Sequence, residues 1–471
     1  MQRVRPKISV MTKRQIGRVH DRSLHILATV GARVESEDAR RVFGKGGAEV
    51  DGDRVRLPAE LVQWAIDAAP PAIDIFDRRG NDAFRLGDGA ETRFGIGVTA
   101  LKYQDPVTDE LSPFQRRHME TTVRLGQLLP SFDVISTVGI IQDIEPTVAD
   151  LYATLEMVAN SSKPLVVLVS EEDLFPSVLD LLEHLHGEIA RKPFVIPYFN
   201  PVSPLVVNRG TTDMMVATID RGLPFIYSNY GMAGATTPIT PAGTLALLNA
   251  ELLAGLVLSQ LLREGTPVIL GILPAFFDMR RMSNFYDPTS YVLDLACAEM
   301  MAFYGLPHCG TGGSGMGWGA DLIAAGHQWT NHLASCLGKV GLAPFVGDNL
   351  GSIGFSPSLI VFADEVIAQA RRFARGVDLD DASFALDDVS QVGPGGNFLM
   401  AAGTLERFRT AYFESAIFPN LTVEAWSEEG HPTADEKLRN YTRQLLEDLE
   451  APDDHDDLVA RGEAFIRSVS E

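Results

Sequence analysis

The sequence predicts an α/β protein built on a TIM-type (β/α)8 barrel, with an N-terminal α+β cap and a C-terminal helical extension. Short apolar runs, typical of buried parallel strands, alternate with helical patterns from about Pro130 onward. Repeated strand–helix alternation of this kind favours a barrel over a doubly wound sheet. The length of 471 residues also suits one large barrel with insertions.

Composition and the order of predicted helices and strands divide the chain into three segments. We expect residues 1–115 to form the cap, residues 116–425 the barrel and residues 426–471 a helical tail. The tail is charged and amphipathic over Thr433–Ser470, so its helices should pack on the outside of the barrel.

The cap combines helices with a hairpin. A helical pattern at His20–Val30 ends at a glycine, and a second helix at Leu61–Ala68 ends before two prolines. Between them, the sequence G-G-A-E-V-D-G-D-R-V-R-L-P contains the Asp-Gly pair of a tight turn. The sequence R-F-G-I-G-V-T-A-L-K-Y-Q-D-P then reads as two strands with a bend at glycine.

The barrel elements follow from short apolar runs and from the amphipathic patterns between them. The predicted strands are Phe132–Thr137, Pro164–Val169, Phe194–Phe199, Pro224–Ser228, Pro267–Ile272, Leu306–Cys309 and Leu342–Val346. The predicted helices include Val148–Asn160, Leu174–His186, Thr212–Arg221 and Ser290–Tyr304.

One apolar run, Ala242–Leu262, is long enough to suggest a membrane span, but Asn249, Glu251 and Gln260 interrupt it. A carboxylate at the centre of a bilayer costs about 2.5–3.5 kcal/mol. A glycine stop and a short apolar strand follow, which is the repeating unit of a parallel α/β protein. We therefore predict a core helix whose polar side chains have buried partners.

Bulk properties exclude several function classes. The apolar content of 45% and the charged content of 22% are ordinary for a globular protein. The net charge of −22 argues against nucleic-acid and anionic-membrane partners, because phosphate contacts need clustered basic residues. The basic residues 1–22 lack the apolar core of a signal peptide.

The chain has three cysteines, Cys297, Cys309 and Cys336. An odd, sparse set without a close pair suggests reduced thiols, and we expect a cytoplasmic location. A zinc site that uses Cys309 and its neighbour His308 is conceivable. However, adjacent residues rarely ligate one metal, and no metal-binding spacing occurs, so we expect no metal.

In a barrel of this type, functional groups follow the carboxyl ends of the strands. That position selects aromatic, amide and charged side chains. Aromatic rings and carboxylates suit a quaternary ammonium ligand, which cation–π attraction holds by about 0.5–2 kcal/mol per contact. An arginine would hold a distal carboxylate, as in a betaine site. The candidate substrate-binding residues are Asn200, Tyr230, Phe276, Arg280, Trp318, Asp321, His327 and Asp348.

Structural roles for these residues stand beside the functional ones. Phe276 has a phenylalanine neighbour, and only one of two adjacent residues can face a site in extended chain. Asp278 and Arg280 could pair with each other. Asn200 could serve only to bond its own turn, and His332 is better explained as a buried core residue.

No residue qualifies as a nucleophile. The sequence has no Gly-x-Ser-x-Gly elbow and no cysteine with a local activating group. The glycines of Gly310–Gly319 lack the lysine of a phosphate-binding loop. We assign no catalytic residue.

Four motifs in order along the chain resemble the trimethylamine methyltransferase family. H-I-L-A-T-V-G-A-R-V and G-A-E-V-D-G-D-R-V-R-L-P, at His25–Val34 and Gly47–Pro58, together look like the opening signature. N-P-V-S-P-L follows at Asn200–Leu205, and A-E-L-L-A-G-L-V-L-S-Q-L at Ala250–Leu261 is followed by G-T-P-V-I-L-G. G-P-G-G-N-F-L at Gly393–Leu399 looks like the C-terminal signature.

The resemblance implies a barrel that moves a methyl group from a methylated amine to the Co(I) of a corrinoid (cobalamin) held by a small partner protein. No cofactor would then be bound permanently by this chain. Cobalt would be the nucleophile, which accounts for the absence of one in the sequence. By analogy, an assembly of identical chains is also expected.

Two departures bear on the substrate. The founding members carry pyrrolysine in the segment that matches Gly310–His327, where this chain has only standard residues. Quaternary amines such as glycine betaine, used by members without pyrrolysine, are therefore the expected substrates. Asn397 and Gly403 stand where the family often has histidines. The alternatives are a non-catalytic betaine-binding barrel and a metal-dependent enzyme using His308, Cys309 or Asp348.

Overall fold

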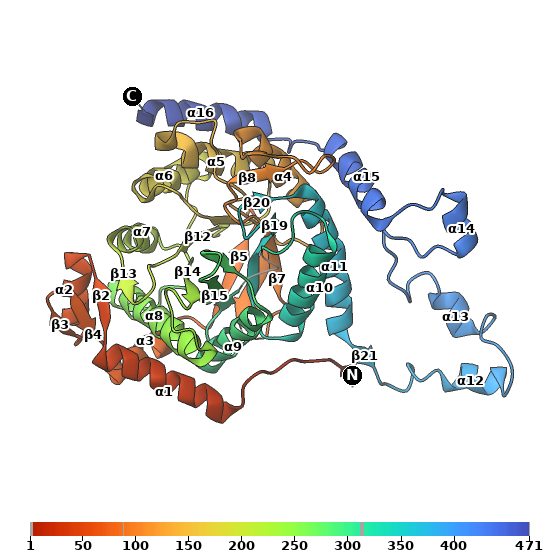
Figure 1. The fold of residues 1–471 in the computed structure, drawn as a ribbon, viewed down its shortest axis with the longest axis horizontal. Coiled ribbons are helices and arrows are strands. Elements are labelled where there is room, and N and C mark those ends of the chain that lie inside the picture. The colour runs from red at the N-terminus through yellow and green to blue at the C-terminus, as the bar shows by residue number, and fades with distance from the viewer. Residues whose placement is uncertain (1–2, 88, 311–314, 471) are drawn as a thin grey trace.

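The computed structural model describes residues 3–87, 89–310 and 315–470. In this part of the chain, parallel strands close into an eight-stranded barrel, in which each strand pairs with the next along the sequence and the last pairs with the first (Figure 1). This confirms the predicted fold class. The strands are β7 (Arg93–Ile96), β10 (Val134–Ser136), β11 (Leu165–Val167), β12 (Val195–Phe199), β14 (Phe225–Ala233), β15 (Val268–Asp278), β17 (His308–Cys309) and β18 (Leu342–Val346).

A helix follows each strand and covers the outside of the barrel (Figure 1). Several of these helices begin with proline at their first turn, where the missing N–H costs nothing. The helices are α4 (Arg116–Leu128), α5 (Pro146–Asn160), α6 (Phe175–His186), α7 (Arg209–Asp220), α8 (Pro241–Leu262), α9 (Pro288–Tyr304), α10 (Leu322–Leu337) and α11 (Pro357–Arg375).

The first barrel strand was predicted as a strand, but as part of the cap. β7 lies within residues 1–115, which were expected to form the cap, but it pairs with β10 and β18 in the barrel wall. Gly95 allows this strand to pack closely against its neighbours. A Cβ at this position would meet Val134 at 2.4 Å and the Pro344 carbonyl oxygen at 3.0 Å. β14 and β15 are also longer than predicted, and they pair side by side up to Ala233 and Phe276.

The long apolar helix α8 is buried, as predicted. It is long and apolar enough to cross a membrane, yet 89% of its most apolar window is buried inside the protein. Its polar side chains have partners. Asn249 donates to Ser23 at 2.9 Å and to Tyr304 at 3.0 Å, and Gln260 donates to the Thr266 carbonyl at 3.0 Å.

The N-terminal segment packs on the outside of α8 and beneath the barrel. Helices α1 (Lys13–Thr29), α2 (Glu37–Lys45) and α3 (Ala59–Ala68) contact α8. A small sheet accompanies them, formed by β2 (Ala32–Val34), β3 (Glu49–Asp51), β4 (Arg54–Arg56) and β13 (Val206–Val207).

A hairpin closes the N-terminal end of the barrel. Strands β5 (Ala72–Phe76) and β6 (Asp82–Gly87) pair with each other. Their apolar side chains, Ile73, Ile75, Phe84 and Leu86, belong to the same buried cluster as the inward-facing residues of the barrel strands. The barrel is therefore sealed at this end, and its functional groups are expected at the other.

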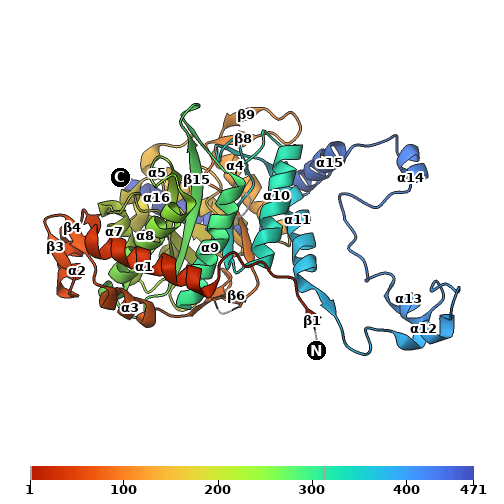
Figure 2. The same ribbon diagram turned by 60° about the horizontal axis from the view of Figure 1, so that its bottom comes forward.

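Further strands surround the carboxyl end of the barrel, which we call the mouth. β8 (Lys102–Gln104), β9 (Leu111–Pro113), β19 (Asp348–Asn349) and β20 (Gly354–Phe355) form a four-stranded sheet there. β16 (Ser283–Phe285) returns antiparallel to the end of β15, and the resulting hairpin stands above the barrel (Figure 2).

The C-terminal part has two regions. Residues 376–433, which we call the arm, extend away from the barrel and carry β21 (Val377–Asp378), α12 (Leu386–Val392), α13 (Ala402–Arg407) and α14 (Val423–Glu428) (Figures 1 and 2). The predicted helical tail then returns to the barrel. α15 (Ala434–Glu447) contacts α11 and α4, and α16 (His455–Ser470) contacts α5 and α6.

Candidate functional site

The mouth brings polar and aromatic side chains from several loops together. Tyr230, near the end of β14, accepts a hydrogen bond on its hydroxyl from Asn284 of β16 at 2.8 Å. Its backbone N–H donates to the side-chain oxygen of Asn200 at 3.0 Å, across from β12. Phe276 and Phe285 face each other at 6.1 Å between ring centroids in the same hairpin. The hairpin therefore fixes one side of the mouth.

A second chain of polar groups leads from the hairpin to a buried carboxylate. Tyr286 follows β16, and its hydroxyl lies 3.4 Å from Ser352 Oγ. Ser352 donates to Asp348 Oδ2 at 2.6 Å. Gly315 packs on Tyr286, where a Cβ would meet the ring at 2.7 Å. The glycine is needed both for this close approach and for its φ of +81°.

Asp348 is the least solvated carboxylate of the mouth. The residue is 1% exposed, and its Oδ1 is buried without a hydrogen-bond partner among the described residues. Burial raises the pKa of Asp348 to about 7, against the opposing effect of hydrogen bonds from Ser352 and the Gly315 backbone. An unpartnered buried oxygen of this kind is costly, so a cation beside it would be stabilised.

Tyr291 and His327 form a third contact close to Asp348. The Tyr291 hydroxyl lies 2.5 Å from His327 Nδ1, which links the first turn of α9 to α10. Burial lowers the pKa of His327, so the ring is neutral near pH 7, and its Nδ1 accepts or donates one hydrogen bond with the tyrosine hydroxyl according to its tautomer. Burial and the Asp348 carboxylate both raise the pKa of Tyr291, which keeps its hydroxyl protonated.

A different buried carboxylate lies between α8 and the barrel wall. Glu251 accepts hydrogen bonds from Ser203 Oγ, the Leu205 backbone N–H and Asn229 Nδ2, each at 2.7 Å. Burial raises its pKa to about 7 as well. Both of its oxygens are used, so this group anchors the loop after β12 to α8.

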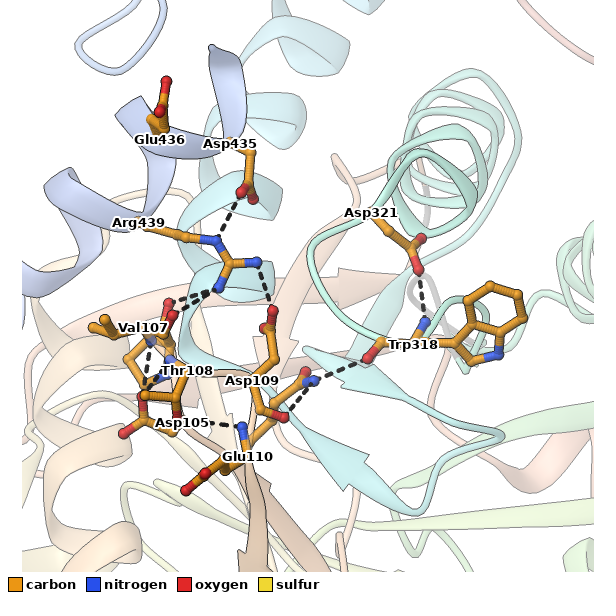
Figure 3. A network of polar contacts seen from close by, with 12 residues as sticks. Asp105, Val107, Thr108, Asp109, Glu110, Trp318, Asp321, Asp435, Glu436 and Arg439 are labelled. Carbon is orange, nitrogen blue, oxygen red and sulfur yellow. Dashed lines mark hydrogen bonds and ion pairs between the residues drawn. The ribbon is translucent and has the colours of Figure 1, made fainter. Parts of the chain in front are cut away.

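The rim of the mouth is held by polar contacts from distant segments (Figure 3). Asp321 accepts from the Trp318 N–H at 2.8 Å and caps α10 through two further backbone N–H groups. Gln104 donates to the Trp318 carbonyl at 2.9 Å. Arg439 of α15 donates to Asp109 and Asp435, both at 2.8 Å, and so ties the β8–β9 loop to the tail.

Of the eight predicted residues, the structure joins some and separates others. Tyr230 and Asp348 lie at opposite ends of the polar chain through Tyr286, with Asn200 and His327 at its edges. Asp321 has a capping role. Phe276 packs in the hairpin.

Two predicted residues lie on the outer surface. Trp318 is 72% exposed on the rim. Arg280 is exposed in the turn of the β15–β16 hairpin, and only its backbone N–H bonds to Asp278. The sequence allowed an ion pair between Asp278 and Arg280. In the structure Asp278 pairs with Arg281 instead, at 2.7 Å. Residues 311–314 of the glycine-rich loop predicted at the mouth lie outside the described residues.

Tyr286, Tyr291 and Ser352 were not predicted from the sequence. Tyr286 lies two residues beyond Asn284, in the loop that was already selected, and Tyr291 opens the helix that follows it. A search of the first helical turn after each strand would have found Tyr291. Ser352 had no local signal.

The metal hypothesis finds no cluster to support it. Among the described residues, no three His, Cys, Asp or Glu side chains are grouped to hold a metal ion. His308 opens β17, whereas Asp348 follows β18 by two residues, so they differ in height along the barrel by roughly 20 Å. All three cysteines are free thiols.

Comparisons with known proteins agree with this architecture. The model of the family "Trimethylamine methyltransferase (MTTB)" matches residues 1–469. The chain is 27% identical to a glycine betaine methyltransferase of Desulfitobacterium hafniense (strain Y51), over 98% of this chain and 97% of that protein. It is 25% identical to the trimethylamine methyltransferase MttB of Methanosarcina barkeri (strain Fusaro / DSM 804), over 97% of each chain.

Among solved structures, the chain resembles the monomethylamine methyltransferase MtmB of Methanosarcina barkeri, with a TM-score of 0.51 and 10% identity over 93% of both chains. At that identity, the likeness concerns the fold alone. The family match, in contrast, spans nearly the whole sequence. The chain therefore belongs to the trimethylamine methyltransferase family of corrinoid-dependent methyltransferases.

Proposed function

We propose that the methyl donor is a quaternary amine, such as glycine betaine, that binds at the mouth beside Asp348, and that the acceptor is the corrinoid of a small partner protein. The observation that carries this proposal is the buried, unpartnered Oδ1 of Asp348 among tyrosines. A quaternary ammonium has no N–H to donate, so it needs a nearby negative charge and aromatic faces. Tyr230, Tyr286 and Tyr291 supply the rings.

The charge of the ligand would be balanced by Asp348. A lone carboxylate in this environment is partly protonated near pH 7, because its pKa is about 7. A bound cation favours the ionised form, and Ser352 then holds Oδ2 while Oδ1 faces the cation. The chain thus orients the methyl–nitrogen bond and excludes water.

The rim fits a broad apolar partner group. Exposed apolar side chains surround the mouth: Met279 (73% exposed) and Met282 (72%) at the hairpin turn, with Trp318 (72%) and Leu322 (92%) at the start of α10. The corrinoid, when presented there, supplies the cobalt nucleophile that accepts the methyl group. No residue of this chain has to act as nucleophile or general acid, since a tertiary amine leaves as a neutral molecule.

Two observations favour a quaternary amine over trimethylamine. The relative with 27% identity over 98% of this chain is named for glycine betaine. In addition, the sequence of Gly310–His327 contains only standard residues, with none that could activate trimethylamine as an electrophile. Trimethylamine must be activated before it can lose a methyl group, whereas a quaternary amine needs no such step.

The test combines binding with turnover. Purified protein is titrated calorimetrically with glycine betaine, proline betaine, carnitine and trimethylamine, and methyl transfer is then followed by the absorbance of methylcobalt in a reduced corrinoid protein. We expect saturable binding and methylcobalt formation with at least one quaternary amine. Methylcobalt formation from trimethylamine alone would contradict the substrate proposal, and binding without transfer would indicate the non-catalytic alternative.

A further inference from the structure

The arm, residues 376–433, lacks a core of its own. Its helices α12, α13 and α14 span seven residues or fewer, and none contains a buried residue. Isolated helices of this length are unstable in water, because most helical stability in proteins comes from packing. The arm contacts the rest of the chain at its start, where β21 pairs with β1 (Arg3–Val4) and Asp378 pairs with Arg3. It makes contact again further along, where Phe418 meets Phe362 of α11 and Arg372 donates to the Ala411 carbonyl.

Large apolar side chains are exposed along the whole arm. They include Met400 (78% exposed), Leu399 (74%) and Tyr412 (74%). Together their exposed area is on the order of 1,000 Å², taking roughly 100 Å² for each half-exposed large side chain. If the arms of two copies were both covered by their partners, the apolar surface removed from water on the arms would total about 2,000 Å², enough for a stable dimer. The full set is Val377, Leu379, Phe384, Leu386, Val389, Phe398, Leu399, Met400, Leu405, Phe408, Tyr412, Val423 and Trp426.

The first half of the arm is also acidic. It carries carboxylates before and within α12, and no basic residue precedes Arg407. Asp381 and Asp387 are exposed and have no ion pair in the described chain. The full acidic set of this half is Asp378, Asp380, Asp381, Asp387 and Asp388.

A basic hollow of about 980 Å³ lies on the N-terminal face of the barrel, beside the root of the arm. It is formed by residues 5–8, the β5–β6 hairpin and the ends of α9, α10 and α11. Among the described residues, Glu91 is the one acidic residue in its lining. The basic lining residues are Arg5, Lys7, Arg85, Lys339, Arg371 and Arg375.

Part of this positive charge is unbalanced. Arg371 pairs with Asp133 and Arg85 pairs with Asp74. Arg5, Lys7, Lys339 and Arg375 have no ion pair within the described residues, although the chain as a whole carries a net charge of −22. This basic hollow and the acidic arm therefore complement each other in charge.

We propose that the arm of one copy packs across the N-terminal barrel face of a second copy, with its acidic first half in the basic hollow. Each copy carries both surfaces, so a two-fold arrangement satisfies both at once. The arm begins at the edge of the hollow of its own chain and extends away from it, which places the rest of the arm where a second copy can contact it. The mouth stays free at the opposite end, and methyl transfer does not depend on this contact.

The first test is the mass in solution. We expect light scattering at about 50 µM to give at least twice the 51.3 kDa of one chain. The double variant Leu399→Asp/Met400→Asp should fall to the mass of one chain. The matched control, Val469→Asp, alters a residue that is 49% exposed on α16, away from the arm, and should leave the mass unchanged. A wild-type mass of 51.3 kDa would overturn the proposal.

A charge exchange tests the pairing of the two surfaces. Asp381→Lys/Asp387→Lys and Lys339→Glu/Arg375→Glu should each weaken self-association at least tenfold, and an equimolar mixture of the two variants should recover it in part. Circular dichroism checks that both variants fold. If the arm variants keep the wild-type mass but lose binding to the corrinoid protein, the arm serves that partner and the proposal is wrong. Unchanged mass together with calorimetric binding of phosphate at the hollow would equally refute it.

Discussion

Among the buried carboxylates of the described chain, Asp348 and Glu251 share a raised pKa but differ in how their oxygens are hydrogen-bonded. Asp348 and Glu251 are 1% and 5% exposed, and burial raises both pKa values to about 7. Glu251 accepts three hydrogen bonds that use both of its oxygens. Asp348 leaves Oδ1 without a partner in the described chain. A perturbed pKa alone does not distinguish a structural carboxylate from a ligand-binding one; unused hydrogen-bonding capacity does.

The largest expected effect comes from removing the charge at Asp348. Asp348→Asn keeps the shape and the Ser352 contact but loses the charge that balances a quaternary ammonium. We expect methyl transfer from the betaine, measured as kcat/KM by methylcobalt absorbance, to fall about 100-fold, which corresponds to about 2.7 kcal/mol. Glu251→Gln, the matched change in the other region, should lower it less than threefold. Equal losses would erase the distinction between the two carboxylates.

The reverse contrast should appear in stability. Glu251→Ala leaves Ser203 Oγ, Asn229 Nδ2 and the Leu205 N–H without their acceptor, so the free energy of unfolding should fall by about 2 kcal/mol. Asp348→Ala removes one acceptor and should cost less. Urea unfolding followed by circular dichroism measures both. A larger loss for Asp348→Ala would show that Asp348 is the structural group.

The sequence identified most barrel strands because a strand covered on both faces must be apolar. It predicted a strand at β7 but assigned it to the cap, because its pairing with β10 and β18 and the close contacts of Gly95 with Val134 and Pro344 are not visible in the local pattern. Tyr230 and Asp348 were predicted because they lie two residues beyond the predicted strands Pro224–Ser228 and Leu342–Val346. Tyr286 and Ser352 were not predicted because the chain returns to the mouth through β16 and β20 and brings them there. This return depends on long-range pairing, which no local sequence pattern encodes.

The same limit explains the residues that were predicted but lie elsewhere. Arg280 was placed in the site because it follows β15, but β15 continues to Asp278 and carries Arg280 into an exposed hairpin turn. Strand length depends on the partner strand, here β16, and is not visible in the sequence of β15. Trp318 was predicted in a loop after the sixth strand, and it lies on the rim with 72% of the residue exposed.

The pH dependence of binding should follow Asp348. The folded-state pKa is raised from 3.8 to about 7, so the carboxyl is protonated below pH 6 and a cation binds to its ionised form. Affinity for the betaine should therefore rise about tenfold from pH 6 to pH 8, as measured by calorimetry. Asp348→Asn should flatten this profile, whereas Glu251→Gln should preserve it.

Stability should change with pH in the opposite direction. The native state holds protons on Asp348 and Glu251 that the unfolded chain has released above its ordinary values of 3.8 and 4.5. The stabilisation from these protons is complete below about pH 4 and is lost as pH rises toward 7. The unfolding free energy of the wild type should therefore fall, relative to that of the double variant Asp348→Asn/Glu251→Gln, as pH rises from 5 to 8. A constant difference would contradict the raised pKa values.

A smaller difference in betaine affinity is expected between variants of the two tyrosines that lie beside these carboxylates. Tyr286→Leu removes a ring face at the mouth and should weaken betaine binding about tenfold, within the range of a desolvated cation–π contact. Tyr286→Phe keeps the ring and should stay within threefold. Tyr227, which packs on Gly255 beside Glu251, provides the control. Calorimetry on Tyr227→Phe should show unchanged affinity, and a loss there would mean that the ligand lies near Glu251 instead.

The smallest effect is expected at the rim. Trp318 lies outside both carboxylate regions, held by backbone bonds to Asp321 and Gln104, with its ring exposed. If the ring serves the partner that presents the corrinoid, Trp318→Ala should raise the KM for the corrinoid protein about threefold and leave betaine affinity unchanged. Trp329→Ala, on the outer side of α10 at 37% exposure, should alter neither value. A change in betaine affinity with Trp318→Ala would instead extend the amine site outward from Asp348 to the rim.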